Sequence, residues 1–168
     1  MTSAVLAFYQ GTGLDTAGRS INVIWAWDHR RLEMVHDFIQ WLFPTHELSR
    51  FNPAAPPLSP EDMKAFRTSP DLQARALRSL DLMLAFYGLN RAGAAIARGP
   101  DFAEKAHWLE PLNHNHLRLT RIMTFLRLVG LGAEADALLG CLLDIAAREG
   151  AGAISERTIQ FWRSTKDV

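Results

Sequence analysis

The chain has 168 residues, 48% of them hydrophobic and 21% charged, which is the length and composition of one globular domain and excludes a disordered segment. Eighteen Lys and Arg residues balance eighteen Asp and Glu residues, so the net charge does not favour binding to nucleic acid or to an anionic membrane. No stretch approaches the roughly 20 apolar residues of a membrane helix, and residues 1–9 lack the features of a secretory signal. With Cys141 as its single cysteine, the chain is expected to be a soluble, cytoplasmic protein without internal disulfides.

The first predicted segment, Met1–Trp27, is an irregular, extended N-terminal arm with Phe8 and Tyr9 as its aromatic anchors. Glycines punctuate the arm, but their spacing is not that of a dinucleotide-binding loop. Ile21–Trp27 is rich in β-branched and aromatic residues. Because no partner strand is in view, this composition predicts an extended packed segment rather than a strand.

Asp28 is a good N-cap for a helix predicted over residues 29–43, which Pro44 would end. At about 100° per residue, apolar residues fall on two stripes of this helix and leave a narrow polar wedge. A helix that is apolar over so much of its circumference is expected at the centre of its domain. The first stripe is Leu32, Val35, His36, Ile39, Leu42 and Phe43, the second is Met34, Phe38 and Trp41, and the wedge is Glu33, Asp37 and Gln40.

The middle of the chain opens with a proline-rich connector, Asn52–Pro60, and Ser59 then caps a short helix that has Pro60 in its first turn. A longer helix is predicted over Pro70–Tyr87, with Gly88 at its C-terminal end. Residues 90–99 are rich in Gly and Ala and weakly patterned, so we predict a loop there.

Four helices are predicted in the last part of the chain, and two of them begin with a polar cap. They are a short one over Phe102–Glu110, one capped by Asn113 or Asn115 that ends near Val129, one over Ala133–Arg148, and one capped by Ser155. The expected fold is therefore all-α: a single domain over residues 1–168, an irregular bundle of about six or seven helices with an extended N-terminal arm. The predicted core includes Trp41, Leu42, Leu80, Leu84, Ile122, Leu126, Leu142 and Trp162.

Sequence motifs of common catalytic sites are absent: there is no G-x-S-x-G, phosphate-binding loop or C-x-x-C. Glu33 with His36, and Glu104 with His107, have the i, i+3 spacing of di-metal helices, and His114-x-His116 is a third pair. Such a site also needs inward-pointing carboxylates from two further helices, which the sequence does not place. We therefore predict no metal and no cofactor.

Two residues of the predicted helices have a charge or a titratable ring on an apolar face. His36 would be either a core histidine with a hydrogen-bond partner or a residue that contacts a ligand or transfers a proton. Arg118 lies among the apolar residues of its helix, and a buried guanidinium requires an anionic partner. That partner is either Asp37 or Asp81 within the protein, or an anion bound at the helix start with His114, Asn115 and Arg121.

Three segments together carry a resemblance to a known family. They are Leu32–Pro44 with its string HDFIQWLFP, Arg78–Gly88 (RSLDLMLAFYG) and Asn113–Ile122 (NHNHLRLTRI), preceded by Phe8-Tyr9. In this order and spacing they resemble the conserved region of the opioid growth factor receptor family, from about Leu6 to beyond Gly132. His36 and His114 match the family pattern, whereas His107 and His116 do not. The chain resembles a stand-alone, microbial version, because the further segments of animal members do not follow.

The resemblance implies a receptor-type function, since the animal family is described as a nuclear and perinuclear receptor for the peptide Met-enkephalin. We therefore predict a non-catalytic domain that binds a peptide or another protein, and no nucleic acid. The alternative is an enzyme that uses His36 or His114 with a carboxylate, with or without a metal. In the predicted binding site, the polar helix start faces the wedge of the earlier helix, and its residues are Glu33, His36, Asp37, Gln40, Asn113, His114, Asn115, Arg118 and Arg121.

Overall fold

The computed structural model describes residues 1–150 and 152–168. The chain forms two compact units. The first comprises Met1–Ser79 and Leu128–Gly130, and the second comprises Leu80–Arg127 and Leu131–Val168. Helix α6 (Pro70–Tyr87) begins in the first unit and ends in the second. That the whole chain is one domain stays a prediction.

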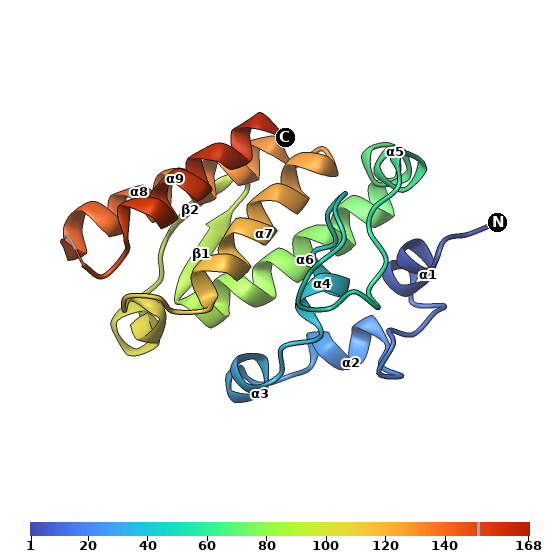
Figure 1. Cartoon of the computed structure of the whole chain (residues 1–168), viewed down its shortest axis with the longest axis horizontal. Coiled ribbons are helices and arrows are strands. Elements are labelled where there is room, and N and C mark those ends of the chain that lie inside the picture. Colours follow the sequence, from blue (N-terminus) through green and yellow to red (C-terminus); the bar gives the residue numbers. More distant parts are fainter. Residues whose placement is uncertain (151) are drawn as a thin grey trace. The chain divides into compact units, whose positions relative to one another are not determined.

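The first unit is built from short helices and the first half of α6 (Figure 1). Two of these helices begin with the caps that the sequence predicts: Asp28 accepts a hydrogen bond from the backbone N–H of Arg31, and Ser59 forms a reciprocal capping box with Asp62. The helices are α1 (Ala4–Gln10), α2 (Ile21–Trp25), α3 (His29–Met34), α4 (Ile39–Leu42) and α5 (Pro60–Thr68).

The prediction of an irregular arm over residues 1–27 is wrong, because the arm contains helices α1 and α2. The hydroxyl of Ser3 accepts a hydrogen bond from the N–H of Leu6, and that of Ser20 accepts one from the N–H of Val23. Ile21 and Ile24 are both fully buried, at the i, i+3 spacing of one helix face. Capping and burial thus outweigh the preference of β-branched residues for extended backbone.

The single helix predicted over residues 29–43 is also wrong, because α3 ends at Met34 and α4 begins at Ile39. Val35 between them has extended backbone, with φ −92° and ψ 132°. A single straight helix with apolar residues on nearly all sides cannot bury all of them against one core. Two short helices with a break between them allow Leu32, Phe38 and Trp41 all to be buried.

The break in this helix moves several side chains off their predicted faces. His36 lies exposed in the break and is not a core histidine. Met34, predicted on an apolar stripe, is 69% exposed, whereas Gln40, predicted on the polar wedge, is 6% exposed. The break therefore changes which residues of this segment can meet a ligand.

Tyr9 and Ser79 form the polar centre of the first unit. The Tyr9 hydroxyl donates to the backbone oxygen of Leu42 and lies 3.0 Å from the Ser79 hydroxyl, which also accepts a hydrogen bond from the Trp25 indole at 3.0 Å. Desolvation by burial raises the pKa of Tyr9 well above its usual value. The phenol therefore stays protonated and joins α1 to α4 and α6, and the Ser79 hydroxyl adds α2 through Trp25.

The second unit contains the end of α6 and a hairpin, followed by the helices of the last part of the chain (Figure 1). Ser155 caps α9 through the N–H of Thr158, as predicted. Helix α8 packs against strand β2 and against α9. The elements are β1 (Leu89–Ala92), β2 (Ala95–Arg98), the 3-10 helix η1 (Phe102–Trp108), α7 (Asn115–Leu128), α8 (Gly132–Glu149), α9 (Glu156–Ser164) and η2 (Thr165–Asp167).

The prediction of a loop over residues 90–99 is wrong, because this segment forms an antiparallel hairpin in which Leu89 pairs with Arg98. Gly93 turns the chain with a φ of 61°. Before the hairpin, Gly88 has a φ of 77°, and a Cβ there would lie 2.9 Å from the Cα of Phe102. The fold is thus mainly helical with one small hairpin in the described residues. The all-α prediction is confirmed for the helical character but does not include the hairpin.

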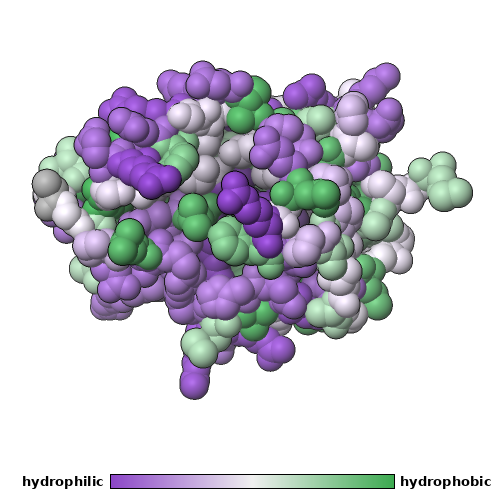
Figure 2. All heavy atoms as spheres, viewed as in Figure 1, coloured by the Kyte–Doolittle hydropathy of each residue, from purple (hydrophilic) through white to green (hydrophobic). Residues whose placement is uncertain are grey.

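The core prediction is confirmed, because every residue that it named is at most 4% exposed. Figure 2 shows one face of the molecule, on which hydrophobic residues lie among hydrophilic ones rather than in one large patch. None of the helices in residues 1–150 and 152–168 has the length and apolar character needed to cross a membrane.

Replacement of Leu84, which is 2% exposed, should show what its burial contributes to stability. Leu84→Ala should lower the free energy of unfolding by about 2–5 kcal/mol, because it removes buried methyl groups and leaves a cavity. Leu117→Ala is the matched control on α7, since Leu117 is 56% exposed. Urea denaturation monitored by circular dichroism measures both, and equal effects of the two substitutions would contradict the burial of Leu84.

Candidate functional site

Three ring N–H groups donate to backbone oxygens in sequence around the start of α7. The Trp108 indole donates to the backbone oxygen of Tyr87 at 3.1 Å. The Nε2 atom of His116 lies 2.8 Å from the backbone oxygen of Trp108, and the Trp162 indole donates to the backbone oxygen of His116 at 3.1 Å. We call Tyr87, Trp108, His116 and Trp162 the ring chain. It ties the end of α6 to η1, α7 and α9.

The rings of this chain also meet edge to face. Ring centroids are 5.5 Å apart for Tyr87 and Trp108, and 5.9 Å apart for His116 and Trp162. All four residues are buried, with His116 the most exposed at 5%. Both the hydrogen bonds and the aromatic contacts are therefore shielded from water. In such a buried environment these contacts contribute most to order.

His116 has a defined protonation state in this arrangement. A carbonyl oxygen only accepts hydrogen bonds, so Nε2 carries the proton and Nδ1 is the atom that titrates. Desolvation by burial lowers the pKa of His116 below 6.5, although the bond to Trp108 acts in the opposite direction. His116 is therefore a neutral structural residue at physiological pH.

Asn115 and Arg118 form a buried polar pair next to the ring chain. The Asn115 side-chain oxygen lies 3.2 Å from the Tyr87 hydroxyl and 3.3 Å from Nη1 of Arg118. Asn115 is fully buried and Arg118 is 5% exposed. The burial of Arg118 agrees with the sequence analysis, and its bond to Asn115 orients the guanidinium.

The two carboxylates named as partners of Arg118 each bind another arginine. Asp81 accepts hydrogen bonds from Nε and Nη2 of Arg91 at 2.7 and 2.9 Å, and Asp37 accepts one from Arg19 at 2.8 Å. The side chains of Asp37 and Asp81 are 55% and 48% exposed. Both alternatives for Arg118, an internal tie to one of these residues and an anion site, stay predictions.

The α7 start also has an outward-facing surface. Asn113 caps the helix, because its side-chain oxygen accepts a hydrogen bond from the N–H of Asn115 at 2.9 Å. Leu112 is 95% exposed and has a φ of 62°, which is unusual for a residue other than glycine. The α7 start surface comprises Leu112, His114 and Leu117, which are exposed, and Asn113 and Arg121, which are half-buried. Burial lowers the pKa of the Arg121 guanidinium.

The other half of the predicted site lies in the first unit. Glu33 is half-buried on α3, and Asp37 is exposed in the break. The side-chain oxygen of Gln40 accepts a hydrogen bond from Asn52 at 3.3 Å, and the same amide of Asn52 donates to the backbone oxygen of Asp37 at 3.0 Å. Gln40 and Asn52 thus hold the break in shape. Because the two halves belong to different units, their union in one site stays a prediction.

Metal ligands and the single thiol are the other groups with a potential chemical role. Within residues 1–150 and 152–168, no group of three or more His, Cys, Asp and Glu residues is arranged to hold a metal ion. Burial raises the pKa of the Cys141 thiol to about 11, so this thiol stays protonated at neutral pH.

His116 is the residue that sequence reasoning missed, since it does not match the family pattern. Helical periodicity contained the signal. His116, Leu119 and Met123 fall on one stripe of α7, and all three are at most 5% exposed. A histidine at the start of an apolar stripe predicts a buried ring with a polar partner.

Comparison with known proteins gives one family. The family model described as the opioid growth factor receptor (OGFr) conserved region matches residues 5–164. No solved structure matches this chain significantly.

Three relatives show the extent of the similarity. The opioid growth factor receptor of Rattus norvegicus is 38% identical over 110 residues, which is 64% of this chain and 19% of the relative. The receptor of Homo sapiens is 36% identical over 110 residues, 64% of this chain and 16% of the relative. Opioid growth factor receptor-like protein 1 of Mus musculus is 31% identical over 127 residues, 74% of this chain and 27% of the relative. The chain therefore matches only about a fifth of the length of these relatives.

Burial of His116 should make stability depend on pH. The folded protein binds the His116 proton less tightly than the unfolded chain, whose pKa is 6.5. The unfolded state then takes up more protons as the pH falls, so the free energy of unfolding should decrease below about pH 6.5 and be unaffected by His116 well above it. His116→Gln, which keeps a donor for Trp108, should weaken this dependence. Urea unfolding between about pH 5 and pH 8 measures it, and an NMR titration that gives His116 a pKa above 6.5 would contradict it.

Arg118 and His114 should behave differently when truncated. Arg118→Ala should lower the free energy of unfolding by about 1–3 kcal/mol, because it removes a buried hydrogen bond and the packing of a long side chain. His114→Ala, at an exposed position one turn away, should change it by less than about 0.5 kcal/mol. Thermal or urea unfolding compares them, and a stable Arg118→Ala variant would show that Arg118 is not needed for the fold.

Proposed function

Because this chain belongs to the opioid growth factor receptor family through its conserved region, we propose that it is a non-catalytic binding domain for a peptide or another protein. The single observation that carries this proposal is the division of the family segment 113–122 into a buried and an exposed part. Asn115, His116 and Arg118 are buried in the fold, whereas His114 and Leu117 face solvent. The exposed part is then available for recognition.

The composition of the α7 start surface supports a peptide or protein partner. Leu112 and Leu117 are 95% and 56% exposed, so their burial against a partner would remove apolar surface from water. His114 and Arg121 beside them supply hydrogen-bond donors, and Arg is favoured at protein interfaces. An apolar centre with polar neighbours is the composition of a protein interface.

The class of partner comes from the relatives, whose names describe receptors for opioid growth factor. A peptide partner is therefore the first expectation, and Met-enkephalin stays a prediction from the resemblance. That Glu33, His36 and Asp37 of the first unit also contact the partner stays a prediction from the sequence. A cytoplasmic location also stays a prediction, which a single cysteine without an internal disulfide partner supports.

Capture of partners from the organism's own cells tests the proposed function. The tagged chain should retain one protein or peptide at a stoichiometry that native mass spectrometry resolves. His114→Ser/Leu117→Ser should reduce this capture about tenfold or more, because it removes donor and apolar contacts together. Phe161→Ser is the matched control, since Phe161 on α9 is also an exposed hydrophobic residue, at 47%.

Three outcomes would contradict this proposal. The first is equal capture by the double variant and by wild type, and the second is equal loss with Phe161→Ser. The third is a stoichiometric metal, measured by elemental analysis, that His36→Ala or His114→Ala removes, which would favour the enzyme alternative instead.

A further inference from the structure

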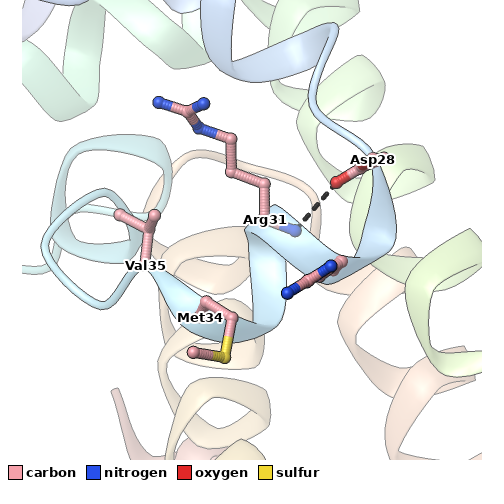
Figure 3. A pocket seen from close by; sticks show the side chains of 5 residues that line it. Asp28, Arg31, Met34 and Val35 are labelled. Atoms are coloured by element: carbon pink, nitrogen blue, oxygen red, sulfur yellow. Dashed lines mark hydrogen bonds between the residues drawn. The ribbon is translucent and has the colours of Figure 1, made fainter.

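A hollow on the surface of the first unit lies beside α3 and is lined by Asp28, Arg30, Arg31, Met34 and Val35. Figure 3 shows that its labelled side chains come from α3 and the residues at its two ends, and that the Arg31 side chain extends away from the helix. Met34 is 69% exposed, so its thioether gives the hollow an apolar part that water covers in the free chain. The lining thus combines two cations and one carboxylate, that of Asp28, with apolar surface.

The two arginines of the hollow have unused hydrogen-bond donors. In the part of the chain that the structure describes, neither guanidinium has a hydrogen bond or an ion pair, and both residues are exposed. A guanidinium offers five N–H donors and binds a carboxylate through two parallel hydrogen bonds. Arg30 and Arg31 are therefore both able to accept an anionic partner.

Arg31 is oriented by an aromatic ring rather than by a carboxylate. Its guanidinium carbon lies 5.0 Å from the centroid of the Trp27 ring, and that of Arg19 lies 5.2 Å from the same centroid. Trp27 itself meets Phe38 edge to face at 5.4 Å. Stacking on an aromatic ring restricts the guanidinium without neutralising its charge or occupying its N–H groups. Arg31 is thereby preorganised for a carboxylate.

Carboxylates near the hollow have other partners. Asp28 caps α3 through the N–H of Arg31 at 2.8 Å, as the dashed line in Figure 3 marks. Asp15 and Asp37 both bind Arg19, at 2.7 and 2.8 Å. Arg30 and Arg31 thus have no carboxylate partner among the described residues, and their two charges outnumber the one carboxylate of the hollow, Asp28.

We propose that this hollow is a docking site for an acidic peptide segment of a partner, with an apolar side chain between its carboxylates. The carboxylates would bind Arg30 and Arg31, and the apolar side chain would cover Met34 and Val35. The inference rests on the proposed function in taking the partner to be a peptide or protein. It adds the chemistry of that partner and a contact surface that the family segments do not include in full.

Peptide binding tests the proposal directly. The probe is a fluorescein-labelled peptide with a central leucine between glutamates, and its affinity for the full chain is measured by fluorescence anisotropy. Replacement of its glutamates by glutamine should weaken binding about tenfold or more, and replacement of its leucine by serine should weaken it to a smaller extent. Equal affinity for the glutamate and glutamine peptides would overturn the proposal.

Substitutions in the protein give the second arm. Arg30→Gln/Arg31→Gln should weaken binding of the acidic peptide about tenfold or more. Arg157→Gln is the matched control, because Arg157 also stacks on an exposed aromatic ring, at 5.6 Å from the Phe161 centroid. NMR shows where the peptide binds, since binding should shift the indole N–H signal of Trp27. The Trp27→Phe variant assigns this signal. Equal loss with Arg157→Gln, or no shift at Trp27, would overturn the proposal.

The same probes and variants distinguish a peptide from other anionic partners, and they distinguish failure of this proposal from failure of the proposed function. An oligonucleotide or an anionic vesicle that binds through Arg30 and Arg31 as tightly as the peptide would replace the peptide as the partner and overturn the proposal. Capture of a cellular partner that His114→Ser/Leu117→Ser abolishes, with no binding of the acidic peptide, would overturn only the α3 proposal. Peptide binding at α3 without any cellular partner at the α7 start surface would support it while contradicting the proposed function.

Discussion

Three hydrogen bonds from ring N–H groups to backbone oxygens hold the second unit together, and its other features depend on them. Trp108, His116 and Trp162 each donate to the backbone of the preceding member of the ring chain. Two of the acceptors, the carbonyl groups of Tyr87 at the end of α6 and of Trp108 at the end of η1, lie where a helix leaves its carbonyls without intrahelical partners. The third, the carbonyl of His116 in the first turn of α7, also accepts a hydrogen bond from the Thr120 hydroxyl. Buried carbonyl groups without partners are costly, so the rings of Trp108 and His116 allow the C-terminal ends of α6 and η1 to be buried.

The ring chain explains why a polar family segment lies in the core. In NHNHLRLTRI, Asn115, His116 and Arg118 are buried with polar partners around the start of α7. The exposed residues of this string are His114, just before them, and Leu117, between His116 and Arg118. A strongly patterned polar string therefore serves two purposes on one helix turn: it supports the fold from inside and exposes a small surface that a partner can contact.

The sequence predicted the features that depend on local rules. Ser59, Ser155 and the glycine after α6 mark helix ends through capping and φ, and the apolar periodicity of α7 and α8 identified their buried faces. It did not predict the break at Val35, because no proline or glycine marks it. The break arises because apolar residues on nearly all sides of one helix could not all be buried. The sequence also did not predict the hairpin and the ring chain, for a related reason. Their stability comes from pairing and burial against residues far away in sequence, to which single-segment patterns are insensitive.

The most direct test of this account is hydrogen exchange at the indole N–H groups of Trp108 and Trp162, followed by NMR as denaturant is raised. Since both protons bond to buried backbone oxygens of the ring chain, they should exchange only when the second unit unfolds as a whole, with the free energy and denaturant dependence of global unfolding. Rapid exchange of either proton through a local opening, with little dependence on denaturant, would contradict the ring chain as the structural basis of this unit.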